Sequence, residues 1–181
     1  MGKIFLWSLF LPLLIHSNAF CLLKDGTRAP EFALVSGDDK NLSLCQLKGM
    51  VITIFYETKE KITTERNREL KNELNQFYTS QPDSIRKQVS KLAVINCSSA
   101  FWPFKGIWKE NLIKNSIKEE MTIYGDWDGR FFENYKITEN ESNFIIIDKN
   151  GIVRYSKAGK VEKNDFASIK HLLKKLVLEN V

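Results

Sequence analysis

The chain has 181 residues, about one ordinary domain, and its 43% hydrophobic and 27% charged side chains match soluble globular proteins, which excludes a disordered or low-complexity chain. A total of 27 Lys and Arg against 22 Asp and Glu gives a net charge of +5, without the run of like charges that a nucleic-acid-binding arm needs. The three cysteines, Cys21, Cys45 and Cys97, form no CxxC, which excludes zinc ribbons, c-type haem attachment and dithiol redox motifs.

The first nineteen residues have the composition of an export signal. Lys3 gives a positive start, residues 4–15 are almost entirely apolar, and Ser17-Asn18-Ala19 places small residues at the −3 and −1 positions of a cleavage site. We therefore predict a signal peptide over residues 1–19 and a single domain over residues 20–181. The mature protein is expected to be exported, to the periplasm or otherwise to the medium.

Two alternatives attach to this segment. Left uncleaved, it would serve as an N-terminal anchor. Cys21 raises the alternative of a lipoprotein, but Phe20 stands where lipoprotein processing requires a small side chain. No other stretch approaches the ~18 apolar residues that span a bilayer, so the mature chain is expected to be soluble, in a compartment where disulfides persist.

The elements of the mature chain alternate between strands and helices. Runs of β-branched and aromatic residues predict strands at 32–35, 50–56, 92–95, 121–124, 144–147 and 152–156. Helices are predicted at 59–80, from Pro82-Asp83-Ser84, at 103–120, at 129–136, and at 164–179 with Asn164 or Asp165 as cap. Turns are predicted at Gly37-Asp38-Asp39 and at Asp148-Lys149-Asn150-Gly151, where Asn-Gly is a strong hairpin signal.

Apolar spacing predicts the face that each long helix buries. In helix 59–80 these residues are Leu70, Leu74, Phe77 and Tyr78. In helix 103–120 they are Ile107, Trp108, Leu112 and Ile117, and in helix 164–179 they are Phe166, Ile169, Leu172, Leu173, Leu176 and Val177. Strand-helix-strand units require parallel neighbours with right-handed crossovers, and the late hairpin adds an antiparallel edge. The order predicts one α/β domain with a mixed sheet between helices.

Four short motifs, in order, carry a family resemblance. They are Gly26…Ala29-Pro30-Glu31-Phe32-Ala33-Leu34, Leu42-Ser43-Leu44…Leu47-Lys48-Gly49, Asp126…Asp128-Gly129…Tyr135 and Ile146-Ile147-Asp148-Lys149-Asn150-Gly151-Ile152-Val153. Over about residues 24–178 the chain resembles the thioredoxin superfamily, most of all redoxin domains of the peroxiredoxin or thiol-specific-antioxidant (AhpC/TSA) type. Val94-Ile95-Asn96 followed by Trp102-Pro103 is similar to the exported YtfJ-like branch. The resemblance implies a thioredoxin-like three-layer α/β fold, with a central mixed β-sheet flanked by helices on both faces.

The residues that carry the chemistry of this family are replaced. Counted from the aromatic residue that ends the central strand, the two CxxC positions fall on Glu60 and Thr63, and the peroxidatic position falls on Thr64. The position of the family's cis-Pro or Arg falls on Ser142. Neither Glu nor Thr supplies the thiolate that both chemistries use as nucleophile. No Cys lies anywhere between residues 46 and 96, so a slip in this count restores nothing.

Cys97 is the one candidate for surviving thiol chemistry. It ends a buried strand, and sites in open α/β sheets gather at the carboxyl ends of strands. A helix beginning near Pro103 would favour its thiolate, whereas the plainer interpretation is a buried, inert Cys. Cys45 replaces a polar residue of the second motif. Any one pair of cysteines could form a disulfide, which would leave an odd thiol.

Other site chemistries have little support in the sequence. His171, on the last predicted helix, has no nucleophile elbow to serve, and Asp126 and Asp128 alone make a poor metal site. We therefore expect no metal and no cofactor. Aromatic residues gather between residues 101 and 135, either as core or as an apolar groove that binds a peptide or hydrophobic ligand. The candidate ligand-binding residues there are Trp102, Trp127 and Asp126.

Taken together, the residues favour an exported redoxin-domain protein that has lost the CxxC and the peroxidatic cysteine. It would act by binding an unidentified envelope protein or a small hydrophobic ligand, with no nucleic-acid partner and no membrane span after signal cleavage. The alternative is a thiol oxidoreductase or peroxidase, an antioxidant enzyme, that uses Cys97. The missing Cys at positions 60–64 favours the first hypothesis over the second.

Overall fold

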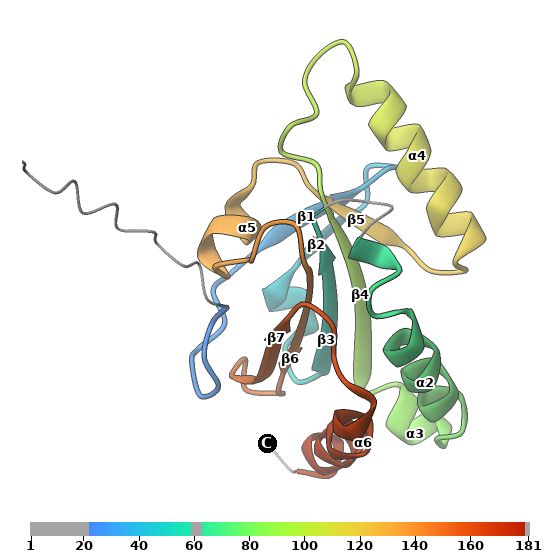
Figure 1. Cartoon of the computed structure of the whole chain (residues 1–181), viewed down its shortest axis with the longest axis vertical. Helices are drawn as coiled ribbons and strands as arrows, with labels where there is room; N and C mark the ends of the chain where they lie inside the picture. The colour runs from blue at the N-terminus through green and yellow to red at the C-terminus, as the bar shows by residue number, and fades with distance from the viewer. Residues whose placement is uncertain (1–21, 59–62, 180–181) are drawn as a thin grey trace, which may run out of the picture.

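A computed structural model describes residues 22–58 and 63–179 of the chain (Figure 1). The strands are β1 (Ala33–Ser36), β2 (Asn41–Ser43), β3 (Val51–Glu57), β4 (Val89–Asn96), β5 (Ile123–Asp126), β6 (Ser142–Ile147) and β7 (Val153–Ala158). The helices are the 3-10 turn η1 (Leu44–Leu47) and α2 (Arg68–Thr79), α3 (Asp83–Arg86), α4 (Lys105–Lys118), α5 (Arg130–Asn134) and α6 (Lys163–Leu178). The expected signal peptide, residues 1–19, lies outside the described residues.

The strands form one seven-stranded mixed sheet in the order β2-β1-β5-β4-β3-β6-β7. Three central strands run parallel, since β3 pairs with β4 and β4 with β5 in that sense. The late hairpin β6-β7 adds an antiparallel edge beside β3, as predicted. At the opposite edge of the sheet, β1 and β2 are also antiparallel. The sequence predicted the strand at 32–35, which corresponds to β1, but it did not predict β2.

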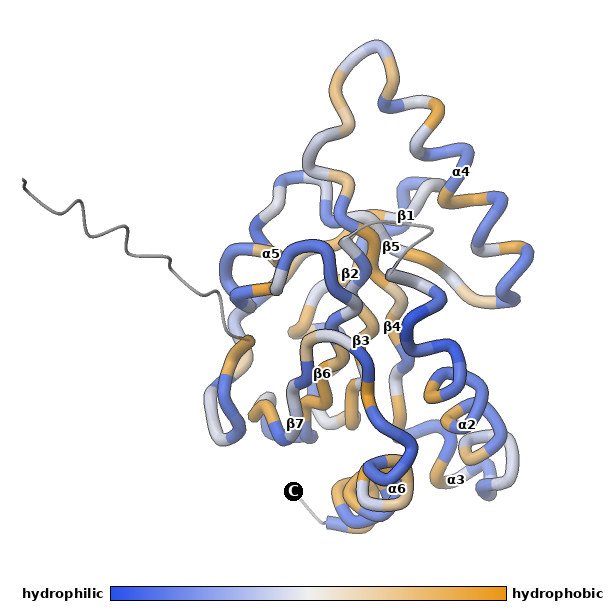
Figure 2. Tube along the Cα trace, in the orientation of Figure 1, coloured by the Kyte–Doolittle hydropathy of each residue, from blue (hydrophilic) through white to orange (hydrophobic). Residues whose placement is uncertain are grey.

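Helices cover both faces of the sheet, which confirms the predicted three-layer α/β arrangement. On one face, Leu70 and Leu74 of α2 pack with Ile169 and Leu173 of α6 over Val51 and the inward side of β6. On the other face, α5, η1 and residues 22–32 pack over β3 and β4. Figure 2 shows the hydrophobic residues concentrated along the central strands between these layers.

Two helix starts differ from the predictions. The helix expected from residue 59 is interrupted, because residues 65–67 form a turn and α2 begins at Arg68. The Asn67 side chain explains the interruption, since its hydrogen bonds reach β6 and the segment before α6 rather than its own helix. The cap of α6 is Glu162 and not Asn164 or Asp165, because Glu162 keeps an extended backbone at φ −77 and ψ 149.

The predicted inward face of α4 is confirmed for two residues and wrong for the other two. Leu112 is buried and Trp108 is half-buried, but Ile107 and Ile117 are 55% and 74% exposed. The β1-β2 turn fixes how α4 sits, since a Cβ atom on Gly37 would lie 2.4 Å from the Lys109 carbonyl oxygen. This close approach presents the Trp108 and Leu112 side of α4 to the sheet and turns both isoleucines toward solvent.

Candidate functional site

Two of the positions singled out by the sequence, Ser142 and Cys97, lie at the end of the sheet where β3 and β4 finish. Glu57, the last residue of β3, pairs with Ile95 of parallel β4 and with Ser142 of antiparallel β6. Cys97 follows β4 at the same edge. Thr63 is buried close to the start of α2, Thr64 is half-buried, and Glu60 lies outside the described residues.

A buried polar network fills this edge between β3, α2 and β6. The Lys71 ammonium donates to Glu57 Oε1 at 2.7 Å, and the Ser142 hydroxyl donates to the same oxygen at 2.9 Å. The Asn67 amide donates to Ser142 Oγ at 3.0 Å and to the Gly159 carbonyl at 2.9 Å. Asn67 Oδ1 accepts from the Val161 N–H at 2.8 Å. We call the four residues Glu57, Asn67, Lys71 and Ser142 the polar lock.

Burial makes the polar lock a strong structural constraint. Glu57, Asn67 and Ser142 are all buried, while the Lys71 side chain keeps a 28% exposed fraction. A buried carboxylate is costly unless it is paired, and Lys71 supplies both the countercharge and a further bond to the Thr64 carbonyl at 3.0 Å. The Lys71 ammonium also lies 5.1 Å from the centre of the Phe55 ring. The network joins β3, α2, β6 and the chain before α6 into one unit.

The chemistry available to the polar lock is limited. Ser142 is fully buried and donates its proton to a carboxylate oxygen, so its hydroxyl is not presented to a substrate. Among the described residues, Glu57 Oε2 is buried without a hydrogen-bond partner. The lock contains no thiol and therefore cannot exchange disulfides or reduce peroxides.

Cys97 lies in a small apolar cluster of its own. It is fully buried with Ile95, Leu112 and Ile123, and Trp108 packs against the same cluster. Its backbone N–H donates to the Asp126 carbonyl at 3.0 Å, which fixes the residue beside β5. A nucleophile needs access, so thiol chemistry at Cys97 would require this cluster to open.

The three predicted ligand-binding residues have different surroundings. Asp126 is buried; its Oδ2 accepts from the Tyr56 hydroxyl at 2.8 Å and from the Phe132 N–H at 2.9 Å. Burial raises the pKa of Asp126, and burial also raises the pKa of Tyr56, with the Asp126 charge as a second cause. The Trp127 indole donates to the Val35 carbonyl at 2.8 Å, whereas Trp102 is 87% exposed.

The aromatic residues between 101 and 135 divide into two groups. Phe131 and Tyr135 are core residues whose rings stack with centroids 4.0 Å apart. Phe101 and Phe104, like Trp102, are exposed, to 66% and 48%. Core packing therefore explains Phe131 and Tyr135, whereas Phe101, Trp102 and Phe104 are exposed to solvent.

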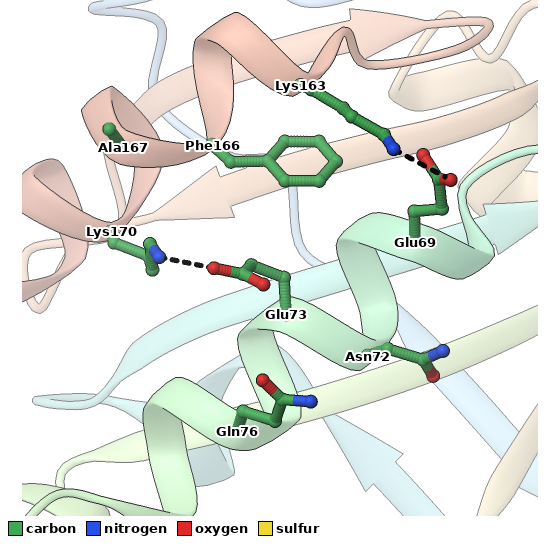
Figure 3. Close-up of a pocket in the computed structure, with 8 residues that line it drawn as sticks. All are labelled: Glu69, Asn72, Glu73, Gln76, Lys163, Phe166, Ala167 and Lys170. Atoms are coloured by element: carbon green, nitrogen blue, oxygen red, sulfur yellow. Dashed lines mark hydrogen bonds and ion pairs between the residues drawn. The ribbon is translucent and has the colours of Figure 1, made fainter.

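Two hollows in the surface of the described residues are large enough for water-sized or larger groups. The larger, about 470 Å³, lies between α2 and α6, where Glu69 and Glu73 face Lys163 and Lys170 (Figure 3). Ion pairs join Lys163 to Glu69 and Lys170 to Glu73 across it, so its charged groups already have partners within the protein. The second hollow, about 280 Å³, lies between β4 and α4 beside the cluster that holds Cys97.

Within residues 22–58 and 63–179, no group of three His, Cys, Asp or Glu side chains is placed to hold a metal ion. In the same residues, we find no helix with the length and apolar character to cross a bilayer. His171 is exposed on α6, in line with a solvated helix position.

No family model matches the chain, and a search of curated proteins gives no match to its sequence. Solved structures do match. A Chlorobium tepidum protein assigned to the DsbE thiol:disulfide interchange proteins aligns with a TM-score of 0.63 at 18% identity, over 86% of this chain and 99% of its own. The chain has a thioredoxin-like fold. The thiol peroxidase of Chromobacterium violaceum aligns with a TM-score of 0.61 at 15% identity, over 86% of this chain and 88% of its own.

A third thioredoxin-like neighbour is the exposed lipoprotein thioredoxin of Streptococcus pneumoniae. It has a TM-score of 0.56 at 18% identity and covers 81% of this chain and 100% of its own. The TM-scores and coverage establish the thioredoxin-like architecture that the sequence motifs implied, and at 15–18% identity the chemistry of this chain has to be argued from its own residues.

The sequence singled out Ser142, but it did not identify the other three residues of the polar lock. Glu57, Asn67 and Lys71 come from a strand end, a turn and a helix, and each by itself is typical of a solvated position. One signal was present: Glu57 directly follows the continuous apolar run of β3, where a carboxylate is buried and needs a countercharge.

Proposed function

We propose that this chain is a non-catalytic member of the thioredoxin-like fold, exported from the cytoplasm, that acts by binding a partner or ligand in the cell envelope. The observation that carries the proposal is the polar lock. Ser142, the residue on which the sequence count places the family's cis-Pro or Arg position, is buried and hydrogen-bonded to Glu57, and Glu57 is paired with Lys71. A site for disulfide or peroxide exchange has to be open to a substrate. Here the side chains at the end of β3 and the start of β6 are hydrogen-bonded to one another.

The surface beside the locked edge supports a binding role. The hollow between β4 and α4 is lined by Ile95, Trp108, Asn111 and Leu112, which expose polar and apolar surface in similar amounts. Small-molecule sites combine apolar side chains with a few polar groups that orient the ligand. This chemistry fits a small hydrophobic ligand or an apolar side chain of a partner protein.

The second candidate is a thiol oxidoreductase or peroxidase based on Cys97. Its support is positional, since Cys97 follows β4 at the edge where β3 also ends, close to Asp126. Complete burial of the residue argues against it.

Enzyme assays separate the two candidates. The purified chain should reduce insulin and consume hydroperoxide no faster than a thiol-free control, and Cys97 should alkylate slowly near neutral pH. Cys45→Ser is the matched control variant, because Cys45 is exposed. Efficient turnover that survives Cys45→Ser and disappears in Cys97→Ser would establish the enzyme and reject the non-catalytic proposal.

A further inference from the structure

A group of exposed apolar residues lies where β4 connects to α4. Phe101, Trp102 and Phe104 are exposed, and Ile107 on the first turn of α4 is exposed as well. We call these four residues the aromatic tip. Figure 1 shows the connection between β4 and α4 at the top of the molecule, projecting beyond the end of the sheet. Large apolar side chains gathered on one projection mark an interaction surface.

The backbone of the aromatic tip is folded. The Phe101 carbonyl accepts from the Phe104 N–H at 2.8 Å and from the Lys105 N–H at 3.1 Å. The rings of Phe101 and Phe104 pack edge to face with centroids 5.3 Å apart. The Lys105 ammonium lies 5.3 Å from the Trp127 ring centre, which ties the turn to the body of the protein. The tip therefore presents its aromatic side chains in a defined arrangement.

The charges around the tip are mainly positive. From Cys97 to Lys109 the only charged residues are Lys105 and Lys109, both basic, whereas farther along α4 Lys114 and Lys118 are accompanied by Glu110, Glu119 and Glu120. Lys109 pairs with Asp39, whereas Lys105 and Lys114 lie on the exposed surface of α4. An anionic surface is the complementary partner for this region, and the chain's net charge of +5 acts in the same direction.

The shape of the region favours a lipid surface over a protein groove. A helix that docks into a groove presents apolar residues in an i, i+3, i+4, i+7 stripe. On the outer side of α4, Ile113 and Ile117 share one face, but Lys109 and Glu110 stand four and three residues before Ile113, so the apolar stripe ends after one helical turn. Projecting Trp and Phe side chains with adjacent lysines are instead typical of segments that enter the interface of an anionic bilayer.

We propose that the aromatic tip inserts into the interfacial layer of an anionic lipid bilayer, with Lys105 and Lys114 close to the headgroups. The proposal goes beyond the binding role above and does not depend on it. A chain with active Cys97 could carry the same tip, and a non-catalytic chain could lack lipid affinity.

Vesicle cosedimentation tests the proposal. The chain beginning at Phe20 is used, because residues 1–19 would bind lipid themselves and because residues 22–179 supply all the strands and helices described above. It is mixed with vesicles of phosphatidylcholine plus phosphatidylglycerol, and separately with phosphatidylcholine alone. We expect binding to the anionic vesicles, weakened by salt, and binding to the neutral vesicles that is at least about tenfold weaker.

Two variants assign the binding to residues of the tip. The double change Phe101→Ser, Trp102→Ser should lower the partition coefficient on anionic vesicles by about tenfold or more, since it removes two inserting rings. Lys105→Gln should lower it by about fivefold, the effect of one interfacial charge. Ile117→Ser is the matched control, because it removes an equally exposed apolar residue from the far end of α4 and should change nothing.

Three outcomes would overturn the assignment. One is absence of binding to anionic vesicles. Another is binding that the double variant retains. The third is self-association in sedimentation velocity that the double variant abolishes, which would make the tip a contact between copies of this chain. The double variant and Ile117→Ser should keep the thermal unfolding midpoint of the parent, since their substituted side chains are exposed. The midpoint of Lys105→Gln should fall by no more than about 2 °C, since it loses one contact with the Trp127 ring at an exposed site.

Discussion

Replacing Lys71 by Met should destabilise the protein by isolating a buried charge. The Met side chain keeps most of the aliphatic stem but loses the ammonium that lies 2.7 Å from Glu57 Oε1. Glu57 would then be a buried carboxylate whose remaining hydrogen-bond partner among the described residues is the Ser142 hydroxyl. Its second oxygen already lacks a hydrogen-bond partner among the described residues.

The magnitude follows from burial. Removing one partner from a fully buried ion pair costs about 3–5 kcal/mol. Lys71 is 28% exposed, so water already reaches this side of the pair and the value has to be reduced. We expect a loss of roughly 2–3 kcal/mol in the free energy of unfolding. For a domain of this size, that loss lowers the thermal midpoint by about 5–10 °C.

Urea unfolding at neutral pH, followed by circular dichroism, measures the effect and its cause. Adding Glu57→Gln to Lys71→Met should restore about 1–2 kcal/mol, because the buried group is then neutral and still accepts a hydrogen bond from Ser142. Lys163→Met is the control, since its pair with Glu69 also joins α2 to a neighbouring element but is well exposed. It should cost less than about 0.5 kcal/mol.

Two results would refute this reasoning. If Lys71→Met cost no more than Lys163→Met, the Glu57 charge would not be held by Lys71. If the double variant were less stable than Lys71→Met alone, the charge of Glu57 would not be the source of the loss, and the polar lock would owe its effect to packing.

Two further predictions concern acid stability and processing. Since burial raises the folded-state pKa of Asp126, the folded state keeps a proton that the unfolded state releases, so this group lowers stability as pH rises from about its ordinary value of 3.8 to its folded pKa. Asp126→Asn should therefore remove a downward component of the stability curve in that acidic range, and parallel curves would contradict the burial argument. Mass spectrometry of native protein should find an N-terminus at Phe20. An intact Met1 or a lipidated Cys21 would reject the cleaved, soluble form.

The central strands were predictable because burial on both faces leaves an unmistakable pattern. The continuous apolar runs of β3 and β6 require cover from two layers, and the Asn150-Gly151 turn fixes the hairpin between β6 and β7. Strand β2 has only three residues, which are too few to show an alternating hydrophobic pattern. It forms because the turn after β1 folds the chain back onto that strand. Short edge strands depend on neighbours that a local pattern does not contain.

The face of α4 shows where periodicity fails. Ile107 and Ile117 fit the apolar spacing of a buried face, yet both are exposed. A periodic pattern tells which residues share a side of a helix, but which side meets the sheet is decided by tertiary contact. Here the contact of Gly37 with the Lys109 carbonyl decides it, and its partners lie 72 residues apart in the sequence.

The candidate site could be located from the sequence but not constructed from it. Counting along the chain singled out Ser142, and in the structure Ser142 begins β6 and pairs with Glu57 at the end of β3. The interaction that defines the site joins Glu57, Lys71 and Ser142, and none of these side chains has a distinguishing neighbour in the sequence. Burial of Glu57 creates the need for Lys71, and burial is a property of the assembled layers.

The sheet order separates the features on which the two proposals rest. The polar lock uses β3 and β6, while Cys97 and the aromatic tip follow β4 and lie beside β5, on the other side of the β3-β4 boundary. Contacts that share no partner act independently on stability and binding. The hydrogen bonds described for the polar lock join β3, α2 and β6 and involve no residue of the connection after β4. That connection is held to the body by Trp108, Leu112 and the Lys105 contact with Trp127, and its apolar residues are exposed. Loss of redox chemistry at the polar lock is thus compatible with a binding surface at the aromatic tip.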